Sequence, residues 1–390
     1  MIILSVETSC DETAITLLEA KGGLTEPYFS VLGNSLFSQI EIHKEYGGVF
    51  PMMAKREHAK NLTHLLVQTL TEAGQHKISN EKISEEKWEE IKKILLREDN
   101  LYEDTKKVLE NISKPDIDMI VVTAGPGLEP ALWVGISFAV ALGTLWDIPV
   151  IPVNHMEGHI ASVLLNKENV VEHQIEFPAL AMLISGGHTE LVEINNWGEY
   201  KIIGQTRDDA VGEAFDKVAR MLGLPYPGGP EISRLAEKAR TENLPHKAKL
   251  PRPMIHTDNL DFSFSGLKTS VLYYIRDNGE LNETDKEDIA REFEDAVVDV
   301  LLEKTKKAIL ETGAKTLVVA GGVISNKKLK ESFHTLENEY SGLRVLTPTQ
   351  KMSTDNSIMI GMAGYIDTLL NPALLTEKIK IVAHGNLRLS

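Results

Sequence analysis

The chain repeats one local pattern: an apolar strand, a short polar turn and a second strand. The first copy occupies residues 1–19, around the turn Glu7 to Thr13, and the second occupies residues 179–194, around Ser185 to Thr189. Such a duplication is typical of an α/β fold with two lobes and a nucleotide cleft between them. A length of 390 residues suffices for two domains with sizeable cores.

The repeat places the expected boundary between the lobes near the middle of the chain. We expect an N-terminal lobe over residues 1–150 and a C-terminal lobe over residues 151–390 that carries the metal and nucleotide sites. Residues 75–114 differ in composition, because they are dense in Glu and Lys and place apolar residues at helical spacing. This segment is predicted to be a helical insertion on the surface of the first lobe; a docking element for a partner is the functional alternative.

Two histidines one helical turn apart form the clearest candidate metal site. His155 and His159 follow an apolar strand, and positions i and i+4 share one face of a helix. Two imidazoles at this spacing can hold a transition metal, although two histidines without a metal are the plainer alternative. Asp355 precedes a small-residue helix expected over residues 357–370. It could cap that helix or supply a third, hard ligand.

The position of Glu157 argues against a zinc protease. In the H-E-x-x-H motif the Glu directly follows the first His and reaches the metal-bound water. Here the Glu comes two residues after His155, roughly 200° around the helix, so it points away from the metal face. The general base of that mechanism is therefore missing.

Small polar and glycine-rich turns after strands mark candidate anion and nucleotide sites. Ser185-Gly186-Gly187 and Gly321-Gly322 each follow a predicted strand, where backbone N–H groups can approach a phosphate or a nucleoside. Asp216 lies on a helix predicted over residues 212–222. Asp11 and Glu12 are adjacent acids in the N-terminal turn and are candidates for a general-base or orienting role.

Composition restricts the class of protein. Hydrophobic residues make up 42% and charged residues 25% of the chain, as in ordinary globular proteins. No apolar run is expected to span a membrane and no basic leader is seen, so we expect a cytoplasmic protein with no membrane partner. The single cysteine, Cys10, excludes an internal disulfide. The formal net charge of −16 disfavours broad nucleic-acid binding, but a local basic patch or a partner could still recruit RNA.

Nine motifs occur in the order found in a known family. They are E-T-S-C-D-E-T, A-G-P-G-L, N-H-M-E-G-H, I-S-G-G-H-T, G-E-A-F-D-K, P-G-G-P, D-F-S-F-S-G-L-K, A-G-G-V-I-S-N and S-T-D-N. Each motif is weak alone, but together they resemble the TsaD family (also called Gcp or YgjD) of bacterial tRNA threonylcarbamoyltransferases. The resemblance covers nearly all of the chain. It excludes residues 75–114, which look like an addition, and the tail after Asn371.

The resemblance implies both a fold and a reaction. The fold is the two-lobed ASKHA fold of actin, Hsp70 and sugar kinases. The reaction transfers the threonylcarbamoyl group from threonylcarbamoyl-AMP to N6 of adenosine 37 in tRNAs that read ANN codons, which forms t6A. The implied metal is one divalent ion, Fe²⁺ or Zn²⁺, on His155, His159 and Asp355. The implied site of the intermediate comprises Leu183, Ile184, Ser185, Gly186, Gly187, Asp216, Gly229 and Asn326. Asp11 and Glu12 match acids associated with activity.

The resemblance also implies partners. These are the tRNA anticodon loop, a paralogous non-catalytic subunit (TsaB-like) and a small ATPase (TsaE-like). The chain departs from the family at Val140, where a basic residue is common, and at Ser233, where some relatives carry an Asp that contacts ribose. The rival interpretations are an ATPase or kinase of the same fold, a metalloprotease and a non-catalytic scaffold.

Overall fold

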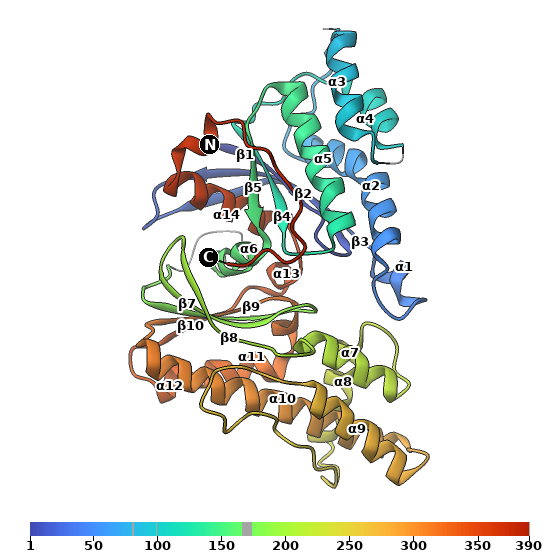
Figure 1. The fold of residues 1–390 in the computed structure, drawn as a ribbon, viewed down its shortest axis with the longest axis vertical. Helices are drawn as coiled ribbons and strands as arrows, with labels where there is room; N and C mark the ends of the chain where they lie inside the picture. The colour runs from blue at the N-terminus through green and yellow to red at the C-terminus, as the bar shows by residue number, and fades with distance from the viewer. Residues whose placement is uncertain (80–81, 99, 166–173, 390) are drawn as a thin grey trace. The chain divides into compact units, whose positions relative to one another are not determined.

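The computed structural model describes residues 1–79, 82–98, 100–165 and 174–389 (Figure 1). Backbone contacts divide the chain into a first unit, residues 1–174 with 354–389, and a second unit, residues 175–353. This division differs from the boundary expected at residue 150. The C-terminal segment returns to the first unit because its long helix packs on the first sheet.

Each unit contains one five-stranded sheet with its own helices. The first unit has strands β1 (Ile2–Glu7), β2 (Glu12–Lys21), β3 (Tyr28–Ser38), β4 (Met119–Gly125) and β5 (Val150–Asn154). Its helices are α1 (Ile40–Lys44), α2 (Pro51–Glu72), α3 (Glu85–Leu95), α4 (Leu101–Leu109), α5 (Glu129–Trp146), α6 (His155–Ala161) and α14 (Ser357–Leu370), with short 3-10 helices η1 (Ser162–Leu164) and η3 (Pro372–Leu375).

The second unit is built in the same way. Its strands are β6 (Ala179–Ile184), β7 (Thr189–Asn196), β8 (Glu199–Gln205), β9 (Thr316–Ala320) and β10 (Arg344–Leu346). Its helices are α7 (Val211–Met221), α8 (Gly228–Thr241), α9 (Ser265–Asn278), α10 (Glu283–Thr312), α11 (Lys327–His334), α12 (Leu336–Glu339) and α13 (Gln350–Ser353), with the 3-10 helix η2 (Gly322–Ser325).

The two sheets share one topology. The first has the order β3-β2-β1-β4-β5, with β1, β2 and β3 antiparallel and β1, β4 and β5 parallel. The second, read from its other edge, has the order β8-β7-β6-β9-β10 with the same directions. The predicted hairpin duplication is confirmed, and it extends to all five strands of each unit.

The two faces of the first sheet are covered by different helices. Leu4 lies in a core shared with α2 and α5, while its neighbour Ser5 lies against Gly361 of α14. Successive side chains of a strand point to opposite faces, so α14 lies opposite α2 and α5. Thr16 and Ser357 join β2 to α14 through hydroxyl oxygens 2.6 Å apart. This packing is what brings the residues just before α14 to the first sheet.

The predicted helical insertion consists of α3 and α4; residues 80, 81 and 99 within it lie outside the described part. Both helices place apolar side chains in the core that contains α2 and α5, through Trp88, Ile91, Leu95, Leu101 and Leu109. The Lys55 ammonium lies 3.2 Å from the buried Glu98 carboxylate and ties the segment to α2. The insertion therefore packs on the first unit and shares its core.

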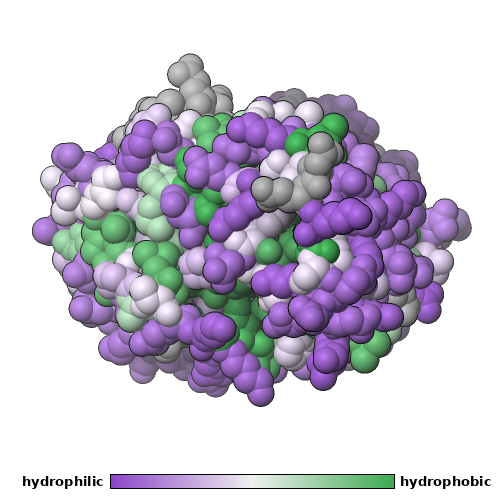
Figure 2. Space-filling model, turned by 90° about the horizontal axis from the view of Figure 1, so that it is seen from above, coloured by the Kyte–Doolittle hydropathy of each residue, from purple (hydrophilic) through white to green (hydrophobic). Residues whose placement is uncertain are grey.

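One helix of the described chain is an exception to the expectation of no membrane-length apolar run. By length and composition α5 could cross a membrane, but 67% of it is buried inside the protein. Its apolar side chains belong to the core of the first unit, which explains why it is apolar nearly all round. On the face drawn in Figure 2, hydrophilic residues predominate and apolar ones form small, separate patches.

The core of the second unit is organised by α10. This helix begins with a capping box between Asn282 and Asp285 and ends at Gly313, whose positive φ of 63° suits glycine. Its apolar side chains pack with those of α7, α8 and α11 against β6 and β9. The helices therefore fix the turns that follow β6 and β9.

Candidate active site

The three predicted metal ligands come together in the first unit. The side chain of Asn154 caps α6 by accepting a hydrogen bond from the N–H of Met156 at 2.9 Å. The rings of His155 and His159 are 4.7 Å apart between centroids, and the Nε2 of each lies 3.3 Å from Oδ1 of Asp355. One ligand atom from each residue lies within 4.8 Å of the other two.

Asp355 is not the cap of the following helix. The N-cap of α14 is Asn356, whose Oδ1 accepts from the N–H of Met359 at 3.0 Å. Helix α6 approaches α14 closely at Gly158, where a Cβ would lie 2.9 Å from Cδ1 of Ile360. The glycine before the second histidine thus permits the helix contact that brings Asp355 to the imidazoles. Of the two interpretations of Asp355, the geometry supports the ligand.

The trio fits a single metal ion. The ring nitrogens of His159 are buried and make no hydrogen bond to any part of the chain that the structure describes. Buried polar atoms normally have partners, and a metal would satisfy Nε2. Two imidazoles and one carboxylate suit zinc or non-haem iron and leave coordination positions open.

Glu7, which the sequence analysis did not single out, holds the first histidine. Its fully buried Oε2 lies 3.2 Å from Nδ1 of His155 and accepts a hydrogen bond from Thr123. A carboxylate on one ring nitrogen fixes the orientation of the other toward a metal. One signal in the sequence could have identified Glu7: it is an acid at the end of an apolar strand. A carboxylate at such a buried position seldom lacks a partner.

The electrostatics of the trio favour a bound cation. Burial alone would lower the pKa of His155, but the carboxylates of Asp355 and Glu7 outweigh it and raise that pKa well above its usual value. Burial lowers the pKa of His159. Burial alone would raise the pKa of Asp355, but the two histidines outweigh it and lower that pKa. The site therefore attracts positive charge, as a metal site must.

The acidic turn lies in the same unit. Glu12 is buried at the start of β2, and its Oε1 accepts from Oγ of Ser38 at 3.2 Å. Burial, reinforced by the charges of Asp11 and Asp355, raises the pKa of Glu12 well above its usual value. A carboxylate with a raised pKa is a better proton acceptor near neutral pH than an ordinary one. Asp11 is partly exposed beside it.

A buried histidine of α2 fixes this turn. Nε2 of His58 lies 3.0 Å from the Cys10 carbonyl oxygen, so it must carry the proton and donate. Nδ1 then accepts from the Thr13 hydroxyl at 2.8 Å. Burial lowers the pKa of His58 to about 4, so the ring is neutral at physiological pH. The turn that carries the acids is therefore attached to α2.

The second unit contains a cavity of about 360 Å³ where the nucleotide was predicted to bind. Four of the implied residues line it, namely Gly186, Asp216, Gly229 and Asn326. Gly322, which the sequence analysis also placed at a nucleotide, lines it as well. Phe215 and Gln350 are further lining residues that the sequence did not single out.

The other implied residues build the turn without lining this cavity. Leu183 and Ile184 are fully buried at the end of β6. The hydroxyl oxygen of Ser185 accepts from the N–H of His188 at 3.1 Å, and its carbonyl oxygen accepts from the N–H of Gly212. Gly187 is not among the lining residues. These contacts make the turn rigid and leave Gly186 at the surface of the cavity.

Three glycines open the cavity wall to a ligand. A Cβ built on Gly186, Gly229 or Gly322 would meet nothing within 4 Å. By contrast, a Cβ on Gly212 would lie 2.8 Å from Cα of Gly186, so that glycine is required for packing. The backbone at the three open positions can therefore approach a bound nucleotide closely.

Hydrogen bonds fix the polar groups of the cavity. Oδ1 of Asp216 accepts from the N–H of Gly228 at 2.7 Å. The amide nitrogen of Asn326 donates to Ser233 at 3.1 Å and to Glu294 at 2.5 Å, and the Ser233 hydroxyl donates to the same carboxylate. Ser233, at which the chain departs from the family, therefore contributes a hydroxyl to a hydrogen-bond network with Asn326 and Glu294. The departure at Val140 lies on α5, packed against the core of the first unit.

Comparisons with known proteins agree with these features. The family model described as TsaD, tRNA N6-adenosine threonylcarbamoyltransferase, matches residues 30–84 and 100–362. The protein of that name from Ralstonia pickettii (strain 12J) is 42% identical over 97% of this chain and 94% of its own length. The one from Herminiimonas arsenicoxydans is 41% identical over 95% of this chain and 93% of its own length.

A solved structure supports the fold. T. kodakarensis HypF matches 72% of this chain and 45% of its own chain, with a TM-score of 0.50 and 14% sequence identity. At this identity the similarity concerns the fold alone. It agrees with the predicted two-lobed ASKHA class and with the paired sheets described above.

The family match covers part of the predicted insertion. It includes residues 75–84 and 100–114 of that segment and leaves out residues 85–99, which contain α3. Both α3 and α4 nevertheless contribute apolar side chains to the core of the first unit.

Proposed function

Because the chain belongs to the TsaD family of tRNA N6-adenosine threonylcarbamoyltransferases, we propose that it transfers a threonylcarbamoyl group to N6 of an adenosine in tRNA. The proposed donor is threonylcarbamoyl-AMP. The proposed acceptor is adenosine 37 of tRNAs that read ANN codons, and the product is t6A. The observation that carries the proposal is that Asp355, far along the chain from the neighbouring His155 and His159, joins them in one candidate metal site.

The reaction is an acyl transfer to a weak nucleophile. The exocyclic amine attacks the carbamoyl carbon, the new N–C bond forms, and the bond from that carbon to the phosphate oxygen breaks to release AMP. The amine loses one proton. Because AMP is a good leaving group, the barrier lies mainly in positioning and in the charge that develops on oxygen.

The first unit supplies the charged groups of the mechanism. His155, His159 and Asp355 would hold one divalent ion, Fe²⁺ or Zn²⁺, with Glu7 orienting the first imidazole. When bound, such an ion acts as a Lewis acid toward carbonyl or phosphate oxygens. Glu12, buried at the start of β2 with its Oε1 against the Ser38 hydroxyl, is the acid that would take the amine proton.

The second unit supplies the adenylate site. Backbone at Gly186, Gly229 and Gly322 packs against the nucleotide, and Asp216 and Asn326 bind its polar groups. The groups are held by hydrogen bonds before any ligand arrives, so little ordering is needed on binding.

Family membership also supports the remaining expectations. We propose that the protein acts in the cytoplasm on the anticodon loop of tRNA, together with a TsaB-like paralogous subunit and a TsaE-like ATPase. A target adenosine in a single-stranded loop is accessible to an enzyme, unlike one stacked in a helix.

Mass spectrometry of tRNA nucleosides from cells depleted of this protein tests the function. We expect t6A to disappear and to return with the wild-type gene but not with His159→Ala. Unchanged t6A in depleted cells would contradict the proposal. ATP hydrolysis by the purified chain alone, with t6A unaffected, would instead favour an ATPase or kinase of this fold.

A further inference from the structure

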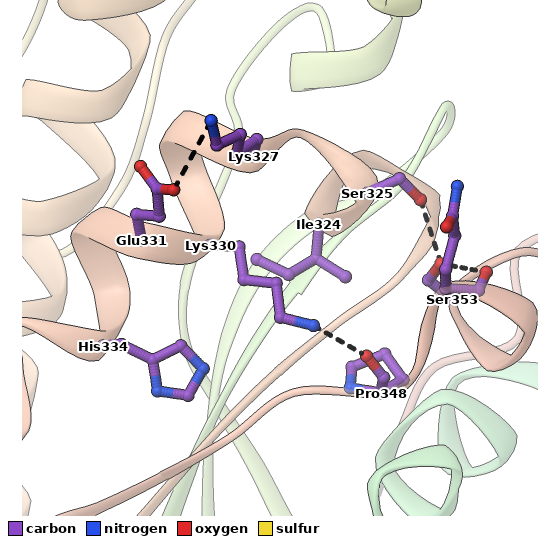
Figure 3. Close-up of a pocket in the computed structure, with 9 residues that line it drawn as sticks. Ile324, Ser325, Lys327, Lys330, Glu331, His334, Pro348 and Ser353 are labelled. Carbon is purple, nitrogen blue, oxygen red and sulfur yellow. Dashed lines mark hydrogen bonds and ion pairs between the residues drawn. The ribbon is translucent and has the colours of Figure 1, made fainter. Parts of the chain in front are cut away.

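A second cavity, of about 550 Å³, lies in the second unit beside α11, η2 and the segment that leads into α13 (Figure 3). Figure 3 shows its lysines engaged within the protein: Lys330 donates to the carbonyl oxygen of Pro348 at 3.2 Å, and Lys327 pairs with Glu331 at 3.9 Å. These contacts hold the basic groups in place without a ligand. A different part of the described chain, at the C-terminal end of the first unit, has contacts that lead to the candidate metal site.

This part is residues 376–389, which form neither a helix nor a strand and which we call the C-terminal strap. Figure 1 shows the strap in dark red, running from the region after α14 to a position beside α6. It is firmly packed: Ile381 and Ala383 are buried in the core of the first unit with β1 and β4, and Leu389 is buried as well. The strap lies beyond residue 362, the last that the family model matches, so the match does not account for it.

The strap binds the turn between β4 and α5, which carries the A-G-P-G-L motif. The N–H of His384 donates to the carbonyl oxygen of Ala124 at 2.9 Å, and the carbonyl oxygen of Gly385 accepts from the N–H of Gly127 at 3.1 Å. A Cβ on Gly125 would overlap the carbonyl oxygen of His384, so the close approach of the strap requires glycine there. The polar backbone groups of the turn are therefore bonded to the strap.

The same turn packs on the loop between β1 and β2. The N–H of Leu128 donates to the carbonyl oxygen of Ser9 at 2.7 Å, and a Cβ on Gly127 would lie 2.7 Å from that oxygen. The N–H of Ser9 donates in turn to Oε1 of Glu7, whose other oxygen lies against Nδ1 of His155. The strap thus reaches the first metal-ligating histidine through one intermediate turn and the carboxylate that orients the ring.

A second contact of the strap is more direct. Nδ2 of Asn154 donates to the carbonyl oxygen of Arg388 at 3.2 Å, while Oδ1 of the same side chain accepts from the N–H of Met156. Asn154 therefore holds the strap with one end of its amide and caps α6 with the other. Helix α6 has only seven residues, so its own hydrogen bonds cannot stabilise it and its position depends on the cap and on packing.

We propose that the C-terminal strap is a positioning element for the metal site: by holding Asn154 and the turn after β4, it directs His155 and His159 toward one ion. The strap touches neither histidine and acts through Asn154 and Glu7. The inference deepens the proposed function and rests on it. Contacts that orient ligands without touching the metal contribute strongly to metal affinity, because the ligating atoms must be held in one geometry.

Asn154→Ser in the full-length protein tests the direct contact. Serine keeps an oxygen that can cap α6 but is too short to reach the carbonyl oxygen of Arg388. The Zn²⁺ affinity of the metal-free protein, measured by competition with a chelator, should fall about 10-fold, the lower end of the effect of an orienting contact. Asn282→Ser is the matched control, because Asn282 caps α10 in the second unit. Its Zn²⁺ affinity should match wild type.

Gly385→Val tests the contact with the turn. A Cβ on Gly385 would lie 3.2 Å from the carbonyl oxygen of Gly127, so the branched side chain would push the strap away from the turn. Zn²⁺ affinity should again fall about 10-fold. Asn386→Val places the same side chain on the exposed neighbouring residue and should bind Zn²⁺ as wild type does. Should either test variant fail to fold, the other decides the question with its own control.

Two further measurements separate positioning from a general effect on stability. The Tm of the metal-free variants should fall by no more than about 2–4 °C, and binding of the adenylate analogue to the second unit should not change. A lower Tm with wild-type Zn²⁺ affinity would make the strap a structural element only and overturn the inference. Equal losses of Zn²⁺ affinity in test and control variants would overturn it too, as would a wild-type protein that binds no divalent metal.

The proposed function is checked separately in the same preparations. Wild-type protein, supplied with its cellular partners, tRNA and threonylcarbamoyl-AMP, should form t6A. Absence of t6A there contradicts the function whatever the Zn²⁺ affinities are. Formation of t6A together with wild-type Zn²⁺ affinity in Asn154→Ser and Gly385→Val contradicts only the role of the strap.

Discussion

The two units have sheets of identical topology, yet the turns after their first strands differ in chemistry. From the last residue of β1 the chain reads E-T-S-C-D-E-T, and the first unit gathers buried carboxylates and imidazoles around that turn. After β6 it continues S-G-G-H-T, and the second unit presents open glycines around a cavity. A shared scaffold thus carries a charged site in one copy and a backbone-lined site in the other, because function resides in the residues added at strand ends.

The two sites also differ in how much space surrounds their glycines. In the first unit, glycines next to the site are packed: a Cβ on Gly158 would meet α14, and one on Gly361 would meet Ser5. In the second unit, Gly186, Gly229 and Gly322 face open space. The first site therefore depends on close helix packing, and the second on the absence of side chains.

The largest expected effect is a loss of metal binding in the first unit that leaves nucleotide binding in the second unit intact. His159→Ala should lower metal affinity by at least about 100-fold and abolish t6A formation, because one of three protein ligands is lost. Binding of the adenylate analogue should persist. The exposed His64→Ala, on α2, is the control and should change neither property. Full metal occupancy in His159→Ala, measured by elemental analysis, would show that the trio is not a metal site.

The reciprocal change lies in the second unit. Gly322→Val should weaken binding of the adenylate analogue by at least about 30-fold. Gly322 lines the cavity and has no atom near its Cβ position, so a valine side chain would occupy space that the nucleotide needs. Metal content and Tm should stay near wild type. Gly23→Val, at an equally open glycine of the first unit, is the control. Calorimetry that finds unchanged analogue binding in Gly322→Val would place the nucleotide elsewhere.

A smaller effect is expected from the residue that orients the metal ligand. Glu7→Gln should lower metal affinity about 10–100-fold, because the amide holds the His155 ring less firmly and lacks the carboxylate charge. Competition with a chelator measures this affinity. Glu12→Gln provides the comparison: it should reduce t6A formation while leaving metal affinity within about threefold. If the two variants lose metal equally, Glu7 has no special orienting role.

The smallest expected effect concerns pH. Burial raises the pKa of Glu157 to about 8, with the charge of Asp367 as a further cause, and burial raises the pKa of Asp367 to about 7. The unfolded values lie near 4, so the folded state holds these protons more tightly. Protonation of these two groups therefore favours the folded state at low pH. This contribution to the free energy of unfolding is lost as the pH rises from about 4 to about 8.

Replacing one member of the pair should flatten this dependence. Asp367→Asn should have a Tm a few degrees above wild type near pH 8, where each kcal/mol of stability corresponds to about 2–4 °C in a domain of this size. The two proteins should converge near pH 4–5. Thermal melts across this range provide the measurement. A constant difference at all pH values would mean that the pair does not titrate as described.

Much of the candidate site was predictable because its signals are local. The i, i+4 spacing of His155 and His159 and the glycines after the strands appear in the sequence as short patterns. Glu7 was missed because its role depends on a contact with His155, which no local pattern records. Leu183 and Ser185 were assigned to the intermediate through the family motif, whereas in the structure they build the turn behind Gly186.

The sequence by itself determined the paired strand–turn–strand units, the helix that carries both histidines and the types of group available to a metal and a nucleotide. Only the tertiary structure decided that Asp355 lies beside both imidazoles while Asn356 is the cap, and that residues 354–389 belong to the first unit. Periodicity in a sequence reports which face of an element is apolar. It does not report which distant element covers that face, and here the packing of α14 on the first sheet places Asp355 beside the histidines.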